Sequence, residues 1–196
     1  RNIPSLVRRA SSSASLAERI DAALAIESIG GPIAFDALFD LAQGARRTDD
    51  PFRLACIQFA AAVSEIEVYQ TIQRRHAVSH RPKARSLYVE IAGWIDRGEM
   101  IDWLFGQLPD LQGTEKRVAL RATMRALKRE KRGSERERLA TLELLRPNEP
   151  ETLAEIFGHL VDAGSERAIP IAREFLETRR ASVENSPELR IIVLAF

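Results

Sequence analysis

The stretch from Arg19 to Ala42, RIDAALAIESIGGPIAFDALFDLA, decides the fold. Apolar residues recur in it at intervals of three and four, and the run Gly30-Gly31-Pro32 interrupts it in the middle. That interval places the apolar side chains on one face of an α-helix. Glycine is typical just after a helix and proline just inside the start of the next one. The stretch therefore predicts two amphipathic helices joined by a short turn.

The same pattern returns along the chain with a nearly constant period. The last apolar residues of alternate expected helices are spaced by 34, 32, 32, 34 and 34 residues, and they are Ile29, Val63, Ile95, Leu127, Val161 and Ala195. Three positions before these residues stands a column of mostly small side chains that includes Ala60, Ala92 and Met124. A pair of amphipathic helices cannot bury its apolar faces alone, so repeated pairs are expected to stack around one continuous core.

The chain resembles the HEAT-repeat family in Arg19 to Ala42 and in Leu153 to Leu176, LAEIFGHLVDAGSERAIPIAREFL. Both stretches look like the Ala-rich helix, Gly-containing turn and second helix of that family, and Pro170 is similar to a proline common there. The middle repeats depart from the pattern, because their turns lack the glycine at the usual place. The resemblance implies an all-α fold, a right-handed α-α superhelix (a solenoid) of about five helix pairs plus a lone C-terminal helix.

Helix-start signals set the expected boundaries. Ser15 with Glu18 has the form of a capping box, so residues 1–14 are expected to be a linker or a short capping helix before a single solenoid domain at 15–196. The repeats are expected at about 15–47, 48–80, 81–112, 113–147 and 148–182, with a partial one at 183–196. Ile191 to Phe196 contains no charged residue. We therefore expect this apolar end to be followed by further chain or to associate with another copy or a partner.

Composition excludes few functions. The 45% apolar and 29% charged content is that of an ordinary globular protein, and a net charge of +1 gives no global bias toward nucleic acid or membrane. The single cysteine fits a reducing compartment, and no apolar run is long enough to cross a bilayer. We expect a cytoplasmic protein, or the soluble part of a longer and even membrane-anchored one.

The sequence predicts no catalytic, cofactor-binding or metal-binding residue. His76 and His80 are four residues apart, a spacing that suits two metal ligands, but Pro82 ends the helix and no Glu or Cys stands beside them. A solvated helix end is the expected reading. Cys56 lies on the buried stripe, where a free cysteine behaves as a small apolar side chain rather than as a nucleophile. No phosphate-binding glycine loop or paired-carboxylate motif is present in the sequence.

The resemblance implies a concave face formed by the second helix of each pair, and with it the binding of a partner protein or peptide. The residues expected on that face are Asp36, Asp40, Tyr69, Gln73, Arg74, Trp103, Gln107 and Arg173. Their mixture of both charges with aromatic side chains suits a helix or an extended peptide. The first hypothesis is therefore a non-catalytic interaction or scaffold module.

A basic stripe supports the alternative of nucleic-acid binding. It consists of Arg117, Arg121, Arg125, Lys128 and Arg132, whose 4-4-3-4 spacing places them on one helical face in the basic region 116–138. Such a stripe could contact phosphates, or it could be the solvated face of a helix with nearby glutamates. Some HEAT-like proteins are DNA glycosylases with a basic, aromatic concave face. Here the stripe is expected on the opposite, convex layer, which favours the partner-protein hypothesis.

Overall fold

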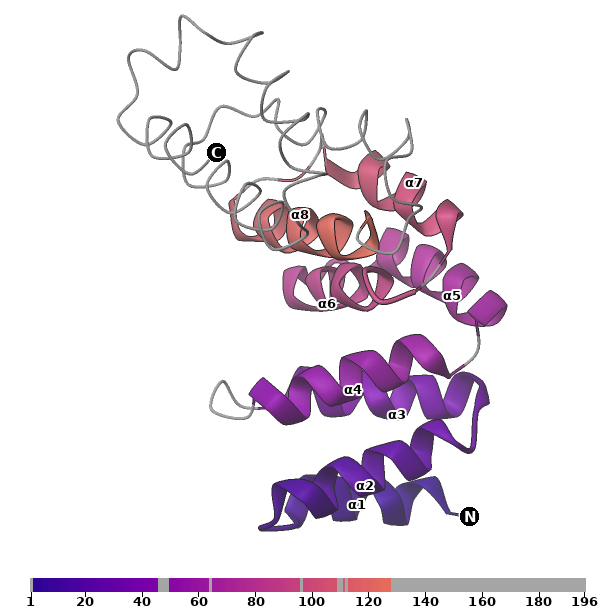
Figure 1. The fold of residues 1–196 in the computed structure, drawn as a ribbon, viewed down its shortest axis with the longest axis vertical. Helices are drawn as coiled ribbons and strands as arrows, with labels where there is room; N and C mark the ends of the chain where they lie inside the picture. Colours follow the sequence, from indigo (N-terminus) through magenta and orange to yellow (C-terminus); the bar gives the residue numbers. More distant parts are fainter. Residues whose placement is uncertain are drawn as a thin grey trace, which may run out of the picture. The chain divides into compact units, whose positions relative to one another are not determined.

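The computed structural model describes residues 2–45, 50–63, 65–95, 97–108, 111 and 113–127. These residues form eight α-helices and no strand, as the expected all-α class requires. The helices are α1 (Ile3–Ser12), α2 (Leu16–Glu27), α3 (Gly31–Gly44), α4 (Asp50–Ala62), α5 (Glu65–Val78), α6 (Pro82–Ala92), α7 (Gly98–Gln107) and α8 (Gly113–Leu127), as drawn in Figure 1. None of them is long and apolar enough to cross a membrane.

Local signals in the sequence account for several helix ends. Ser15 caps α2, because its hydroxyl oxygen accepts a hydrogen bond from the Glu18 backbone N–H at 3.5 Å. The Glu18 carboxylate is engaged by another residue, since the Ser13 hydroxyl donates to it at 2.6 Å. Between α2 and α3, Gly30 and Gly31 have φ values of 76° and 77°, a left-handed conformation that side chains other than glycine rarely adopt.

The described helices of the first compact unit pack in two alternating series. The chain divides into units Arg1–Leu104 and Phe105–Phe196. In the first unit, α2 packs on α4 and α4 on α6, while α1 packs on α3 and α3 on α5 (Figure 1). Consecutive helices also pack together, α1 with α2, α3 with α4 and α5 with α6. The sequence predicted either a linker or a short helix in residues 1–14. The structure shows that residues 3–12 form helix α1, which packs on α3 and so belongs to the series of second helices.

Apolar side chains of successive helices form the core, whereas Ile29, the first residue of the 34-residue pattern, is 37% exposed. The largest fully buried side chains include Ile26 of α2, Phe35 of α3, Phe52 of α4, Ile72 of α5 and Ile91 of α6. The predicted column is buried as well, since Ala60 and Ala92 are 0% exposed and Met124 is 4% exposed. The single-domain organisation and the repeat boundaries stay predictions, and residues 128–196 lie outside the described residues.

The buried column yields a first testable prediction. Replacing Ala92 with leucine is expected to lower the free energy of unfolding by about 1–3 kcal/mol, because the added carbon atoms enter a space that is already filled. Urea unfolding followed by circular dichroism measures the effect. The matched control is Ala17→Leu, a change at an exposed position of α2 that should stay within about 0.5 kcal/mol of the parent. Equal midpoints for the two variants would contradict the proposed register.

Candidate partner-binding face

The residues expected on the partner-binding face come from α3, α5 and α7. Asp40 and Arg74 are exposed, whereas Asp36, Tyr69, Gln73, Trp103 and Gln107 are partly buried. Gln107 belongs to the second unit, and Arg173 lies outside the described residues. Partial burial means that several of these side chains also contact neighbouring helices, and those contacts decide how much of each remains for a partner.

Asp36 is engaged by an arginine from the next helix in its series. Arg75 of α5 donates to both carboxylate oxygens of Asp36, and the contact from Nη2 to Oδ2 measures 3.1 Å. The Arg75 side chain is 38% exposed and that of Asp36 is 44% exposed, so water screens the pair. The hydrogen bond with Asp36 raises the pKa of Arg75, and the arginine stays charged. The pair links α3 to α5 at the surface and contributes about 0–1 kcal/mol.

An aromatic contact lies beside this ion pair. The ring of Tyr88 on α6 stacks on Phe39 of α3, with centroids 4.4 Å apart and an interplanar angle of 22°. Burial raises the pKa of the Tyr88 hydroxyl, and the positive charge of Arg75 opposes that rise. Tyr88 is therefore a neutral phenol that joins α6 to α3. Tyr88 and Arg75 were not among the predicted site residues, because their partners stand in other repeats.

Trp103 of α7 contacts α5 through a histidine. The rings of His76 and Trp103 meet edge to face, with centroids 5.2 Å apart and an interplanar angle of 86°. His76 is only 5% exposed, so the expectation of a solvated helix end is wrong for this residue. His80, one turn further on, is exposed as expected. The cause lies outside the local sequence, because the Trp103 ring of α7 packs against the His76 ring.

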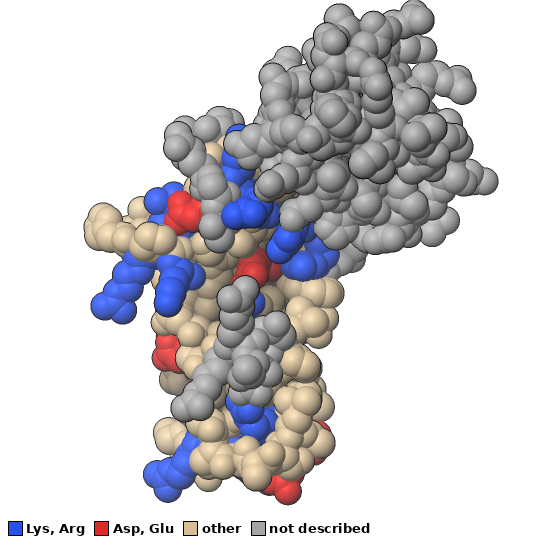
Figure 2. All heavy atoms as spheres, turned by 90° about the vertical axis from the view of Figure 1, so that its left-hand side faces the viewer, with Lys and Arg blue, Asp and Glu red and all other residues tan. Residues whose placement is uncertain are grey.

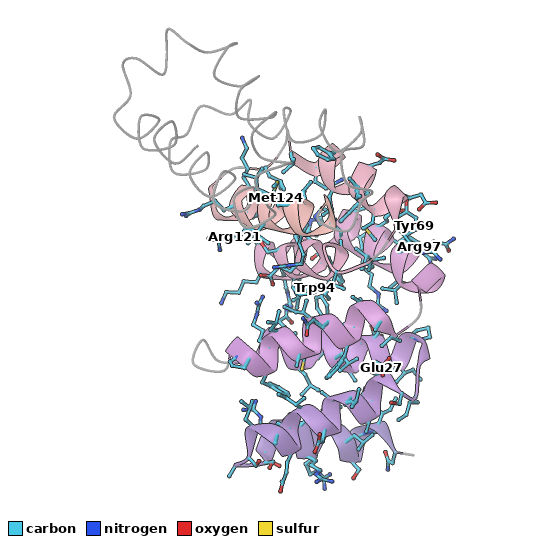
Figure 3. The ribbon with its side chains drawn as sticks, viewed as in Figure 1. Glu27, Tyr69, Trp94, Arg97, Arg121 and Met124 are labelled. Atoms are coloured by element: carbon cyan, nitrogen blue, oxygen red, sulfur yellow. The ribbon has the colours of Figure 1, made fainter. Side chains whose placement is uncertain are left out.

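The remaining polar residues of α5 interact mainly within their own helix. The Gln73 side-chain amide donates to the Tyr69 hydroxyl at 2.8 Å. The Arg74 guanidinium donates through Nε to the Gln70 carbonyl at 3.2 Å, and its side chain is exposed. Figure 3 shows Tyr69 on α5 in the first unit. These hydrogen bonds orient the side chains along α5, and of the three residues Arg74 is the exposed one that a partner can reach.

Asp40 stands at the edge of an open pocket in the first unit. The pocket has a volume of ≈ 490 Å³ and is lined by Val7, Ser11, Arg19, Asp40, Leu41, Gly44, Ala45 and Phe52. Arg19 is held there from two sides, since its Nε donates to the Ala10 carbonyl at 2.9 Å and its Cζ lies 4.0 Å from the centroid of the Phe52 ring. A carboxylate, a guanidinium, a hydroxyl and apolar walls thus meet around one concave surface.

The basic stripe is only partly described. On α8, Arg117 and Arg121 are exposed and Arg125 is partly buried, while Lys128 and Arg132 lie outside the described residues. Figure 3 labels Arg121 and Met124, which belong to the exposed and buried sides of this helix. Figure 2 shows Lys and Arg side chains interspersed with Asp and Glu on one face of the molecule.

Comparison with known proteins identifies no family and no curated relative for this chain, since no family model and no curated sequence matches it. Among the described residues, no group of three or more His, Cys, Asp or Glu side chains is placed to hold a metal ion. A function is therefore proposed below from the side chains and their contacts alone.

Proposed function

We propose that this chain is a non-catalytic interaction module of the HEAT-like solenoid type, which binds a protein or peptide partner on the face of its second helices, α3, α5 and α7. The observation that carries the proposal is that this face combines a packed aromatic side chain with exposed charged side chains. On that face Trp103 contacts His76 of α5, while Asp40 and Arg74 are exposed on two different helices. Packed helices that carry exposed acidic and basic side chains are typical of surfaces that recognise a protein partner.

The pocket beside Asp40 adds an anchoring position to this proposal. Deep contacts near the centre of an interface contribute most of the binding free energy, and open pockets receive the side chains that make them. The walls supplied by Val7, Leu41 and Phe52 are apolar, and the Asp40 carboxylate stands at their edge. A partner side chain with an apolar stem and a polar end matches that lining.

The experiment that tests the proposal is an affinity capture from the native host followed by mass spectrometry. The parent chain is compared with the double variant Asp40→Lys, Arg74→Glu, which reverses both outward charges and leaves the net charge unchanged. The matched control, Asp21→Lys with Arg8→Glu, makes the same reversal at exposed positions of α2 and α1. We expect a protein that the parent and the control capture and the double variant loses, with at least a tenfold drop in recovered partner.

Two outcomes would contradict the proposal. In the first, both variants capture the same proteins as the parent, which would place binding away from this face. In the second, both variants lose them equally, which would show that recognition depends on overall charge distribution. Thermal unfolding of each variant, measured in parallel, shows whether a loss comes from unfolding of the chain.

Nucleic-acid binding is the second candidate, and the exposure of Arg117 and Arg121 one turn apart on α8 favours it. Two arginines at that separation can contact successive phosphates. The net charge of +1 weighs against a large phosphate-binding surface. Fluorescence anisotropy with random double-stranded DNA across a salt series separates the candidates. A steep fall of affinity with salt, abolished by Arg117→Gln with Arg121→Gln, would favour nucleic acid.

The remaining expectations stay predictions. A cytoplasmic location rests on the single cysteine of the sequence. Association through the apolar segment Ile191 to Phe196 concerns residues outside the described part of the chain. Sedimentation of the isolated chain tests that association, because a strict monomer at high concentration would argue against it.

A further inference from the structure

His76 is a buried titratable side chain that the proposed partner binding does not use. It lies on α5 with 5% of its surface exposed, and its ring stands at 86° to the ring of Trp103 on α7. Its Nε2 atom is buried and has no hydrogen-bond partner in the described residues. Buried polar atoms of this kind are rare in folded proteins, and each one indicates a special environment.

The charged groups around His76 do not favour a positive imidazolium. From α6, the charge of the Arg85 guanidinium acts on His76. It has the sign of an imidazolium, and its own buried Nε has no hydrogen-bond partner in the part of the chain that the structure describes. From α7 the facing group is the neutral Trp103 ring, and the adjacent Asp102 is exposed. On α3, the Asp36 carboxylate is already engaged by Arg75. Burial lowers the pKa of His76, and the charge of Arg85 lowers it further.

Protonation would place a charged N–H at a position where nothing accepts its hydrogen bond. The neutral ring leaves one weakly polar atom unsatisfied, whereas the imidazolium needs acceptors for two N–H groups. A buried charge without a partner is far more costly than a buried neutral polar atom. Nε2 has no acceptor among the described residues, so we expect a protonated ring to move away from Trp103 toward water.

We propose that the His76–Trp103 contact is an acid-sensitive joint between α5 and α7, closed while the imidazole is neutral and loosened when it takes up a proton. Because the folded pKa lies below the unfolded value, the stabilisation is fully present above about pH 6.5, the ordinary pKa of histidine. It is lost as the pH falls below that value, since the unfolded chain then binds a proton that the folded one resists. The joint shares Trp103 with the proposed partner-binding face, but its test needs no partner.

An NMR titration of the histidine ring protons tests the proposal on the intact chain. The variants His76→Gln and His80→Gln assign the resonances, and contacts to the Trp103 ring provide a second assignment if the first variant fails to fold. We expect His76 to titrate below pH 6.5 and its resonance to lose the Trp103 contact as it does so. His80 is the internal reference, because it lies just after the end of α5 and is exposed.

Denaturant unfolding at several pH values provides the second measurement. Between pH 7 and pH 5, the parent midpoint should fall further than that of His76→Phe, which keeps an aromatic ring without a titratable group. The His80→Gln variant, a change at an exposed position outside the His76–Trp103 contact, is the matched control. A His76 pKa at or above 6.5 would overturn the proposal, since it would mean that the Trp103 ring stabilises the cation. An unchanged pH dependence in His76→Phe would overturn it as well.

Discussion

Replacing Phe35 with alanine is expected to lower the free energy of unfolding by about 3–5 kcal/mol, the range for removal of a buried aromatic side chain. Phe35 is 1% exposed on α3, and its ring lies 6.2 Å from that of Phe39 and 5.8 Å from the Arg75 guanidinium carbon. The change removes these contacts together and leaves a cavity where α3 faces its neighbours. Since domains of this size are stable by about 5–15 kcal/mol in total, the variant should lie close to its unfolding threshold at 25 °C.

The matched control is two residues away on the same helix. Ile33 is apolar like Phe35 but 71% exposed, so Ile33→Ala should change the free energy of unfolding by no more than about 0.5 kcal/mol. Chemical denaturation of both variants under identical conditions measures the difference. Similar midpoints would mean that the buried face of α3 is not the one described.

The largest kinetic effect is expected at Cys56. Burial raises the pKa of its thiol from 9.0 to about 12, and the charge of Arg19 only partly opposes that rise. At pH 8 the reactive thiolate is therefore about a thousandfold rarer than in an exposed cysteine. We expect a thiol reagent such as dithionitrobenzoate to react with the folded chain at least three orders of magnitude more slowly than with the unfolded chain.

A second cysteine variant controls for access. Ala77 is exposed on α5, so Ala77→Cys in a Cys56→Ala background should react at the ordinary rate of a free thiol. The same pKa shift should make the folded chain less stable above about pH 9, because the unfolded thiol ionises there while the buried one keeps its proton. Rapid reaction of Cys56 in the folded parent would show that the α4 face is open to water.

The sequence predicted those features of the fold that depend on spacing along the chain. The helices and the buried column of Ala60, Ala92 and Met124 follow from intervals of three, four and about 34 residues, and such intervals are read directly from the letters. The burial of Cys56 follows from the same intervals, whereas the exposure of His80 was predicted from the helix end before Pro82. The predicted solenoid arrangement, in contrast, depends on how successive pairs are oriented.

The contacts between helices could not be predicted, because they depend on which side chains meet when two helices cross. Asp36 finds its partner 39 residues later at Arg75, and nothing in the sequence marks that pair among many other charged residues. The burial of His76 has the same origin, since Pro82 indicates that a helix ends before it but cannot show that the Trp103 ring of α7 packs against His76. The pocket at Asp40 likewise needs Arg19 and Phe52 from two other helices.

The two alternating series of helices have a consequence for how the first unit acquires its structure. Its most extensive contacts join helices that are one, two or three positions apart in chain order, from α1 with α2 to α3 with α6. Each new helix can therefore add to those before it after closing only a short loop, which costs little chain entropy. Proteins rich in such local contacts refold in roughly microseconds to milliseconds. A nascent chain leaving the ribosome could thus bury α1 to α4 against one another before α6 has been synthesised.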